Sequence, residues 1–510
     1  MFDWILKGGL VIDGTRAKPY IANICIQDGK IAQITRDAVT DAEQILDIRG
    51  LAVTPGFIDI HSHSDRVPFS ALLPDSKPMQ GVTLEIAGNC GSSAFPVIGK
   101  HEEVGKGFAS LDAYIAAAHP TLIHYGSLVG HSELRLSVMG FENRDPSAQE
   151  LEEMKQLLEQ QMEQGAFGMS MGLIYPPSSF SSLEELTELA AVVARHNGIM
   201  SVHMRNEGPQ LFEAVEEVLE IARLSGVHLQ ISHLKLQTPA QWGKAPLLLE
   251  RIRKAQAEGI RVTCDQYPFC ASCTGLDTLV PGWAHAGGTE ALMERLRRKE
   301  GDICQKIEEN IGYRGATEGI LFATTKPELL WILGKSLQQV SDQWQLSPVD
   351  SVIRILLETD CTAHAMYFNM SEEDMLTIMG QDFICVGSDG SSVSMEKVPT
   401  LALRHPRNYA TFPRFWETVR EHRLMPMEDA VYKMTGLPAS ILGLKDRGIL
   451  KEGYMADIAV FDPETFGSPA TFPAPHVRPH GLQHLLVDGQ AVIKDGALTG
   501  LTPGRVLRKQ

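Results

Sequence analysis

The chain has 510 residues, 44% of them hydrophobic, which is enough apolar sequence for two or three domains at roughly 100–200 residues per domain. Its 46 lysines and arginines against 63 aspartates and glutamates give a formal charge of -17, which disfavours nucleic acid as a partner. The eight cysteines follow no disulfide framework, and we find neither a signal sequence nor a long apolar run, so we expect a cytoplasmic protein with no membrane segment.

The first part of the chain alternates apolar and polar residues in the way half-buried strands do. Isoleucines at 24, 26, 31 and 34 flank one turn-forming pair. The turn-forming pairs here are Gly8-Gly9, Asp13-Gly14 and Asp28-Gly29. We expect a β-rich segment over residues 1–54.

In the middle of the chain, short apolar runs alternate with helical patterns. The runs are Met200-Ser201-Val202, Leu229-Gln230-Ile231-Ser232 and Phe383-Ile384-Cys385-Val386. Helical spacing covers residues 147–164 and 182–197, with Ser181 or Ser182 as the start of the second helix. This alternation is typical of a parallel sheet and predicts an α/β fold, a TIM-like (β/α)8 barrel over residues 55–436. The stretch 285–345, rich in Glu, Lys and Leu, predicts a helical insertion.

Strand-like alternation returns near the end of the chain, at residues 453–462 and 485–493. We expect these strands to pair with those of the first segment. Residues 1–54 and 437–510 would then form one small, discontinuous β-sandwich domain.

The strongest local signal is the run Gly56-Phe57-Ile58-Asp59-Ile60-His61-Ser62-His63. Residues two apart on a strand face the same side, so the imidazoles of His61 and His63 can reach one metal ion. Two unrelated polar residues at a strand end would give the same pattern. Whether His61 and His63 bind a metal therefore depends on whether later strands supply further ligands.

Three later apolar runs end in similar residues: His203, His233 and Asp389. The active-site residues of a barrel lie at the carboxyl ends of its strands, so these side chains converge on one mouth with His61 and His63. The remaining histidines, such as His131, His285 and His364, are expected to be structural.

Several segments resemble the D-aminoacylase branch of the amidohydrolase superfamily. The resemblance runs nearly from end to end, and the cysteine and Ser-His-Leu-Lys segments favour this branch over the superfamily at large. The segments are Thr54 to Asp65, Gly88-Asn89-Cys90-Gly91-Ser92-Ser93, His203 to Gly208, Ile231-Ser232-His233-Leu234-Lys235 and Gly387-Ser388-Asp389-Gly390.

The resemblance implies a Zn²⁺ ion held tightly by Cys90, His203 and His233. It also implies a second, weaker metal position formed by His61, His63 and Asp389. Thiolate and imidazole suit zinc, and three protein ligands leave room for water. Many amidohydrolases bridge two metals with a carbamylated lysine, and no lysine lies at an evident bridging position before His203. Cys90 fills that role in the related branch.

The implied reaction is hydrolysis of the amide bond of an N-acyl-D-amino acid, which releases a carboxylate and a free D-amino acid. Zinc supplies an activated water and polarises the scissile carbonyl. Asp389 is the expected general base, which accepts the water proton and then delivers it to the leaving nitrogen.

Substrate contacts are expected from three residues. Lys235, two residues after His233, could bind the α-carboxylate, and the resemblance implies Tyr175 and Tyr267 as further contacts. We expect loops 391–400 and 405–414 to line the side-chain pocket. Because the first of these loops contains no arginine, the sequence favours neutral or apolar side chains over acidic ones, unless Arg404 or Arg407 reaches into the pocket.

Two alternatives remain open. A cyclic-amide hydrolase of the dihydroorotase or hydantoinase type would share the barrel, the metal and the base, but it would open a ring. A catalytically inactive homologue would serve as a binding protein. The partner is expected to be a small molecule, and the sequence leaves assembly into a homo-oligomer open.

Overall fold

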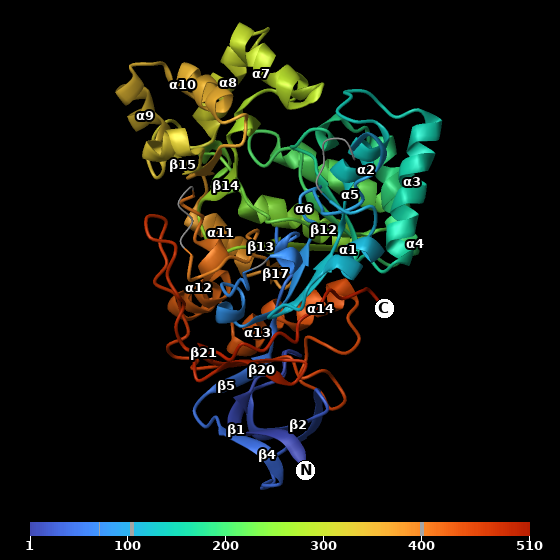
Figure 1. The fold of residues 1–510 in the computed structure, drawn as a ribbon, viewed down its shortest axis with the longest axis vertical. Coiled ribbons are helices and arrows are strands. Elements are labelled where there is room, and N and C mark those ends of the chain that lie inside the picture. Colours follow the sequence, from blue (N-terminus) through green and yellow to red (C-terminus); the bar gives the residue numbers. More distant parts are fainter. Residues whose placement is uncertain (71, 102–106, 398–401) are drawn as a thin grey trace.

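The computed structural model describes residues 1–70, 72–101, 107–397 and 402–510. It has three parts stacked along the longest axis (Figure 1). A sheet built from both ends of the chain lies at the bottom, a barrel occupies the middle, and a largely helical lobe lies at the top.

The bottom part is a nine-stranded sheet within the described residues. Its spatial order is β21-β20-β19-β18-β5-β1-β2-β3, with β4 paired to β1. The strands are β1 (Phe2–Val11), β2 (Tyr20–Gln27), β3 (Lys30–Thr35), β4 (Ala42–Asp47), β5 (Ala52–Pro55), β18 (Ile458–Phe461), β19 (Leu482–Val487), β20 (Gln490–Lys494) and β21 (Ala497–Leu498). The central β5–β18 pairing joins the two ends of the chain.

Of the residue pairs expected to form turns, Asp28-Gly29 forms one and Gly8-Gly9 does not. Asp28 and Gly29 both have positive φ, 52° and 74°, and connect the antiparallel strands β2 and β3. Positive φ at both central residues defines the tight hairpin turn that Asp-Gly sequences favour. The prediction of a turn at Gly8-Gly9 was wrong, because this pair lies inside β1, where the register with β2 shifts between Leu6 and Gly9. Glycine at an irregular strand position accommodates such a bulge.

The middle part is the expected TIM-like barrel of parallel strands. Around the barrel, β6-β7-β8 is followed by β9-β10-β11-β12-β13-β17. A parallel bridge between Ser62 and Gly390 joins the segments that follow the first and last strands. The strands are β6 (Phe57–Asp59), β7 (Val82–Ala87), β8 (His124–Ser127), β9 (Val129–Gly130), β10 (Gly168–Gly172), β11 (Ile199–His203), β12 (His228–Ile231), β13 (Val262–Gln266) and β17 (Ile384–Val386).

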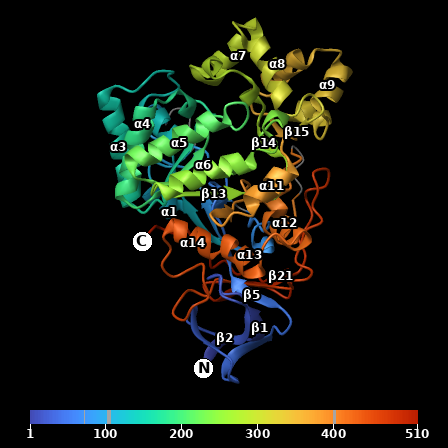
Figure 2. The same cartoon turned by 180° about the vertical axis from the view of Figure 1, so that it is seen from behind.

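Helices cover the outside of the barrel, and Figure 2 shows several of them from behind. Ser182 caps α4, one of the two serines that the sequence predicted as its start, and Ser147 caps α3 in a capping box with Glu150. Their apolar faces pack on the strands in the largest core cluster. The helices are α1 (Leu111–Ala117), α2 (His131–Val138), α3 (Ala148–Glu163), α4 (Leu183–Arg195), α5 (Leu211–Ser225), α6 (Ala245–Ala257), α11 (Glu372–Met379), α12 (Arg407–His422), α13 (Met427–Met434) and α14 (Gly436–Leu442).

The top lobe includes the expected insertion, but it is not purely helical. It contains α7 (Gly288–Arg298), α8 (Ile303–Tyr313), α9 (Leu337–Trp344) and α10 (Pro348–Glu358). Strand β15 (Ile320–Thr324) pairs with β16 (His364–Tyr367), which also pairs with β14 (Ser272–Gly275). The lobe therefore begins before residue 285 and ends after residue 345, and it has an apolar core of its own.

The chain returns to the barrel at its end. Gly504 bridges to Thr121 before β8 and Val506 bridges to Tyr125 within β8, and Figure 1 places the C-terminus next to the barrel. Helix α14 packs its apolar residues against β6 and β7, in the barrel core rather than in the sheet. None of the described helices combines the length and the apolar character of a membrane-spanning segment.

Candidate metal centre

The polar residues expected at the barrel mouth come from the ends of five different strands. In chain order they are His61 and His63 after β6, Cys90 after β7, His203 at the end of β11, His233 after β12 and Asp389 after β17. Because the strands are parallel, their carboxyl ends open on the same side of the barrel. The structure brings all six residues to this side.

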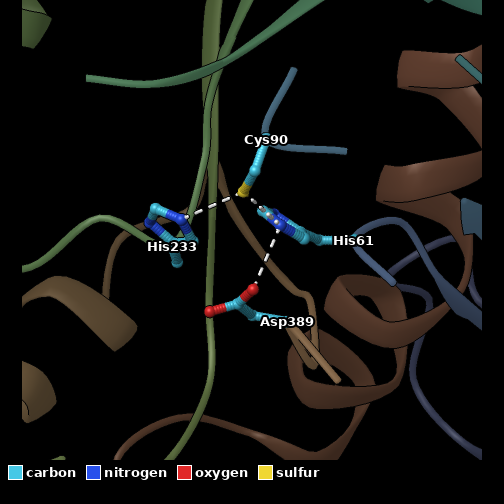
Figure 3. Close-up of side chains that lie close together, drawn as sticks. All are labelled: His61, Cys90, His233 and Asp389. Carbon is cyan, nitrogen blue, oxygen red and sulfur yellow. Dashed lines mark hydrogen bonds and ion pairs between the residues drawn. The ribbon is translucent and has the colours of Figure 1, made fainter. Parts of the chain in front are cut away.

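Four of these side chains form one compact group, drawn in Figure 3. Ligand atoms of His61, Cys90, His233 and Asp389 all lie within 4.8 Å of one another. Cys90 Sγ lies 3.4 Å from His61 Nε2 and 3.5 Å from His233 Nε2. Asp389 Oδ1 lies 3.4 Å from His61 Nε2 and 2.9 Å from His63 Nε2. The thiol therefore stands between two imidazoles, and the Asp389 carboxylate contacts the same nitrogen of His61 as the thiol does.

A second group shares His233 with the first. His203, Glu207 and His233 offer ligand atoms within 4.8 Å of one another. Glu207 Oε2 lies 3.6 Å from His203 Nε2, and Glu207 Oε1 lies 3.1 Å from His233 Nδ1. The sequence analysis did not select Glu207, although it lies in the same His203 to Gly208 segment that carried the resemblance. An acidic residue shortly after a strand-end histidine was the available signal.

Lys235 lies at the cavity wall but is already engaged. Its Nζ lies 2.6 Å from Glu207 Oε1, 2.7 Å from His233 Nδ1 and 3.0 Å from the carbonyl oxygen of His233. Lys235 donates to Glu207 and to the carbonyl oxygen of His233. When His233 Nε2 is free to bind a metal, His233 Nδ1 carries the proton and donates to Glu207, so Lys235 orients Glu207 and, through it, His233.

Asp265, near the end of β13, is another residue that the sequence analysis missed. Its Oδ1 lies 3.0 Å from His61 Nδ1 and accepts the backbone N–H of His233 at 2.8 Å. A carboxylate on one ring nitrogen of a histidine leaves the other nitrogen free to bind a metal and fixes the orientation of the ring. Asp265 thus presents His61 Nε2 to the cluster. Its position at a barrel strand end was the available signal.

Three residues of the first group have left-handed backbone conformations. The φ angles of Cys90, His233 and Asp389 are 54°, 36° and 50°. Such conformations cost non-glycine residues on the order of 1–3 kcal/mol each, and they persist only where the surrounding contacts hold them. They concentrate at functional sites, which agrees with the convergence of these side chains.

The charges of the cluster favour the anionic forms that metals bind. Burial alone would raise the pKa of the Cys90 thiol, but the facing imidazoles of His61 and His233 outweigh burial and lower this pKa well below its ordinary value. Burial also opposes ionisation of Asp389, yet Arg407, aided by His233 and a hydrogen bond from His63, lowers the pKa of Asp389 well below its ordinary value.

A cavity of about 730 Å³ opens above the cluster. Tyr175 lines it, with its ring centroid 5.0 Å from that of His203 and its hydroxyl 2.9 Å from Thr274 Oγ1. Tyr267 does not belong to the described cavity lining. It is buried beneath Arg407, whose guanidinium lies 5.2 Å from the centre of its ring.

Arg407 is the cation nearest to Asp389. Its Nη1 lies 2.7 Å from Asp389 Oδ2, and its Nη2 donates to the carbonyl oxygen of Cys273 at 3.2 Å. Ser391 and Asn408 from the two expected pocket loops also line the cavity, and residues 398–400 of the first loop lie outside the described residues. The top lobe contributes Arg314 to the same wall.

The donor set fits a borderline-soft divalent metal such as zinc, because it combines a thiolate with imidazoles and carboxylates. His203 Nδ1 is buried without a hydrogen-bond partner in the described part of the chain, which leaves this nitrogen uncommitted. The residues His131 and Glu185 form a separate buried pair at 2.9 Å on α2 and α4, as expected for a structural histidine. His364 lies at the cavity wall instead.

Comparison with known proteins supports the same interpretation. The Amidohydrolase family matches residues 44–310 and 367–493. The chain is 35% identical to N-acyl-D-glutamate deacylase of Alcaligenes xylosoxydans xylosoxydans, over 99% of this chain and 96% of that protein. It is 33% identical to D-aminoacylase of the same organism, over 100% of this chain and 98% of that protein. The chain belongs to the amidohydrolase family, within the D-aminoacylase branch.

A solved structure agrees with this placement. The crystal structure of N-acyl-D-glutamate deacylase from Bordetella bronchiseptica has a TM-score of 0.84 and 33% identity, and the match covers 99% of each chain. That enzyme is complexed with zinc and with a phosphonate inhibitor that mimics the tetrahedral intermediate of its reaction. D-hydantoinase has a TM-score of 0.58 at 16% identity, which shows the shared fold alone.

Proposed function

We propose that this chain is a zinc-dependent hydrolase of N-acyl-D-amino acids, which releases a carboxylate and a free D-amino acid. The observation that carries the proposal is the position of Cys90 Sγ, 3.4 Å and 3.5 Å from the Nε2 atoms of His61 and His233. The family membership and the relatives that are named N-acyl-D-amino-acid deacylases support the reaction class. The preference for the D enantiomer rests on those relatives alone.

We assign the tight metal position to Cys90, His203 and His233, and a second, weaker position to His61, His63 and Asp389. Zinc bound there would lower the pKa of a water molecule and polarise the scissile carbonyl. Lys235 and Glu207 hold His233 from behind, and Asp265 holds His61. The protein thereby fixes the orientation of its ligands before any metal binds.

Asp389 is the proposed general base. Its low pKa keeps the carboxylate ionised, and its two oxygens contact His63 and Arg407 at 2.9 Å and 2.7 Å. It accepts the proton of the attacking water and delivers it to the leaving nitrogen, so that the amine departs neutral.

Arg407 is the proposed anchor of the substrate α-carboxylate, in place of the expected Lys235. A guanidinium matches a carboxylate with two parallel donors. Arg407 lines the cavity beside Asp389, whereas Lys235 is buried and is held by Glu207 and by the carbonyl oxygen of His233. Tyr175 remains a candidate substrate contact at the cavity wall. Tyr267 would act by supporting Arg407 from below.

The side-chain preference of the substrate stays a prediction of neutral or apolar groups. Arg314 and Arg404 line the cavity as well, so acidic substrates belong in the same test. The partner of the site is a small molecule. The eight cysteines are all free, which supports a reducing compartment such as the cytoplasm, where Cys90 stays reduced.

The test is hydrolysis of N-acetyl-D- and N-acetyl-L-amino acids by the zinc-loaded protein, with a chelated sample as control. Zinc-dependent release from the D series alone would support the proposal and would rank side chains from leucine to glutamate. The panel should include hydantoin and dihydroorotate. Turnover of these rings without release from acyl amino acids would favour the cyclic-amide alternative, and zinc binding without any turnover would favour an inactive homologue.

A further inference from the structure

A buried lysine lies beneath the metal centre, outside the set of cavity-lining residues. Lys77 directly precedes the short helix η2 (Pro78–Gln80), and its side chain is 0% exposed. Its Nζ lies 2.5 Å from Asp59 Oδ2 in β6 and 3.7 Å from Glu85 Oε1 in β7, and it also donates to Ser388 Oγ. Both carboxylates are fully buried as well.

Such a charged triad is a poor device for stability alone. Removing two carboxylates and an ammonium from water is expensive, and well-packed apolar residues often do as well or better. The value of a fully satisfied polar network lies instead in the geometry that it enforces. The contacts of this triad indicate which geometry that is.

The hydrogen bonds made through Asp59, called here the Asp59 arm, hold the residue that precedes Asp389 in the chain. Asp59 Oδ1 accepts the backbone N–H of Ser388 at 2.9 Å. The Ser388 hydroxyl accepts from Lys77 and from the N–H of Gly390 at 3.0 Å, and it donates to the carbonyl oxygen of His61 at 3.3 Å. One hydroxyl therefore links Lys77, the strand end that carries His61 and the turn that carries Asp389.

The hydrogen bonds made through Glu85, called here the Glu85 arm, hold the residues that follow Asp389 in the chain. Glu85 accepts from the Ser64 hydroxyl at 2.9 Å and from the Ser392 hydroxyl at 2.7 Å. The N–H of Ser392 donates to Ser64 Oγ at 2.8 Å. Ser64 directly follows His63, so this arm fastens the histidine pair to the far side of the Asp389 turn.

Asp389 requires such support because its φ is 50°. A non-glycine residue stays in this conformation only where its surroundings hold it. The two arms bind the residues on both sides of Asp389, at positions 388 and 392. Both arms contact the ammonium group of Lys77.

We propose that Lys77 is a positioning residue, which through Asp59, Ser388 and Glu85 sets Asp389 against the His61–His63 pair. The inference rests on the proposed function in so far as Asp389 is the base and a ligand of the weaker metal position. Lys77 itself touches neither the substrate nor the reacting atoms.

The test uses Ser388→Ala in the full-length protein, because this change removes one hydroxyl and leaves every buried charge in place. We expect zinc affinity at the weaker position to fall about tenfold or more, and kcat to fall with little change in KM. The tighter zinc position should keep its affinity. Ser127→Ala is the matched control, since Ser127 is a buried serine that ends β8 and contacts the Leu128 carbonyl oxygen. It should change neither quantity.

Lys77→Met should have the same effects as Ser388→Ala, only larger. If Lys77→Met does not fold, Ser388→Ala still decides the matter. The proposal would be overturned if Ser388→Ala had the same kcat as wild type and bound zinc at each position as tightly as wild type does, even if the variant were less stable. Zinc titration needs no substrate, so it tests the role of Lys77 even if the wild-type protein fails to hydrolyse N-acyl-D-amino acids.

Discussion

Among the described residues, metal-ligating side chains come close enough together for a cation in two regions of the molecule, and the two regions behave differently. One is the cluster at the barrel mouth around Cys90. The other lies where the barrel meets the terminal sheet and contains His124, Asp457 and Asp488 within 4.8 Å. At this junction Arg447 bonds to both carboxylates, and Arg505 bonds to Asp488.

The difference lies in the balancing charge. Two arginines already neutralise the two carboxylates of the junction, so a metal would have to displace them. At the mouth, Arg407 balances Asp389 and Lys235 balances Glu207, whereas among the described residues the titratable partners of Asp265 and of the Cys90 thiol are imidazoles. Residue types alone do not define a metal site, because the surrounding charges decide whether a cation is needed.

Removal of the thiol should have the largest effect on turnover. Cys90→Ala removes the ligand that stands between the two imidazoles, so we expect loss of the tight zinc and a fall in turnover of about 10³ or more. Zinc content after dialysis and kcat measure this. Cys25→Ala, a change at a buried cysteine of β2, is the control and should alter neither. Retention of tight zinc in Cys90→Ala would show that the ligand assignment is wrong.

Asp389→Asn should come next. We expect tight zinc to stay bound while kcat falls by at least about 10², because the amide cannot accept the water proton. Zinc stoichiometry and steady-state kinetics measure the two effects separately. Turnover close to wild type would remove Asp389 from the proton-transfer step.

Asp265→Asn should weaken the centre without dismantling it. Loss of the carboxylate behind His61 should lower zinc affinity by about 10–100-fold, with activity recovering at high zinc concentration. Asp374→Asn offers a control, because Asp374 is a buried aspartate that caps backbone N–H groups at Gly243 and Ala245. If both variants bind zinc like wild type, Asp265 does not orient His61.

The junction should respond in stability and not in chemistry. Arg447→Met leaves Asp457 without its buried partner, which should cost about 3 kcal/mol of unfolding free energy. Zinc content and kcat of the folded variant should stay at wild-type values. Denaturant titration and kinetics together test this, and a loss of bound zinc would mean that the two clusters are coupled.

The smallest expected effect is a pH dependence at the junction. Burial opposes ionisation of Asp488, but a hydrogen bond from His124 and the charge of Arg447 lower its pKa below the ordinary value. The stabilisation is therefore present above about pH 4, the ordinary pKa of an aspartate, and is lost as pH falls through the lowered pKa. Below pH 4, stability should decline more steeply in wild type than in Asp488→Asn. Parallel declines would contradict this assignment.

The sequence by itself determined the strand pattern, the α/β class and five candidate ligands at the barrel mouth: His61, His63, His203, His233 and Asp389. These could be predicted because they depend on local alternation, on the period of two along a strand and on the shared direction of parallel strand ends. Cys90 was identified as a ligand through the family resemblance. Tight turns such as Asp28-Gly29 were equally local. The role of Gly8-Gly9 could not be predicted from local sequence, because a bulge depends on the register with the neighbouring strand.

Only the tertiary structure decided which charges face one another. The spacing predicted that Lys235 could bind the substrate, but the fold places its Nζ against Glu207 and the carbonyl oxygen of His233. Arg407 reaches Asp389. Lys77 contacts Asp59, Glu85 and Ser388, and Ser388 lies 311 residues from Lys77 in the sequence. Electrostatic contacts are set by distance in space and by burial, and neither can be read from spacing along the chain.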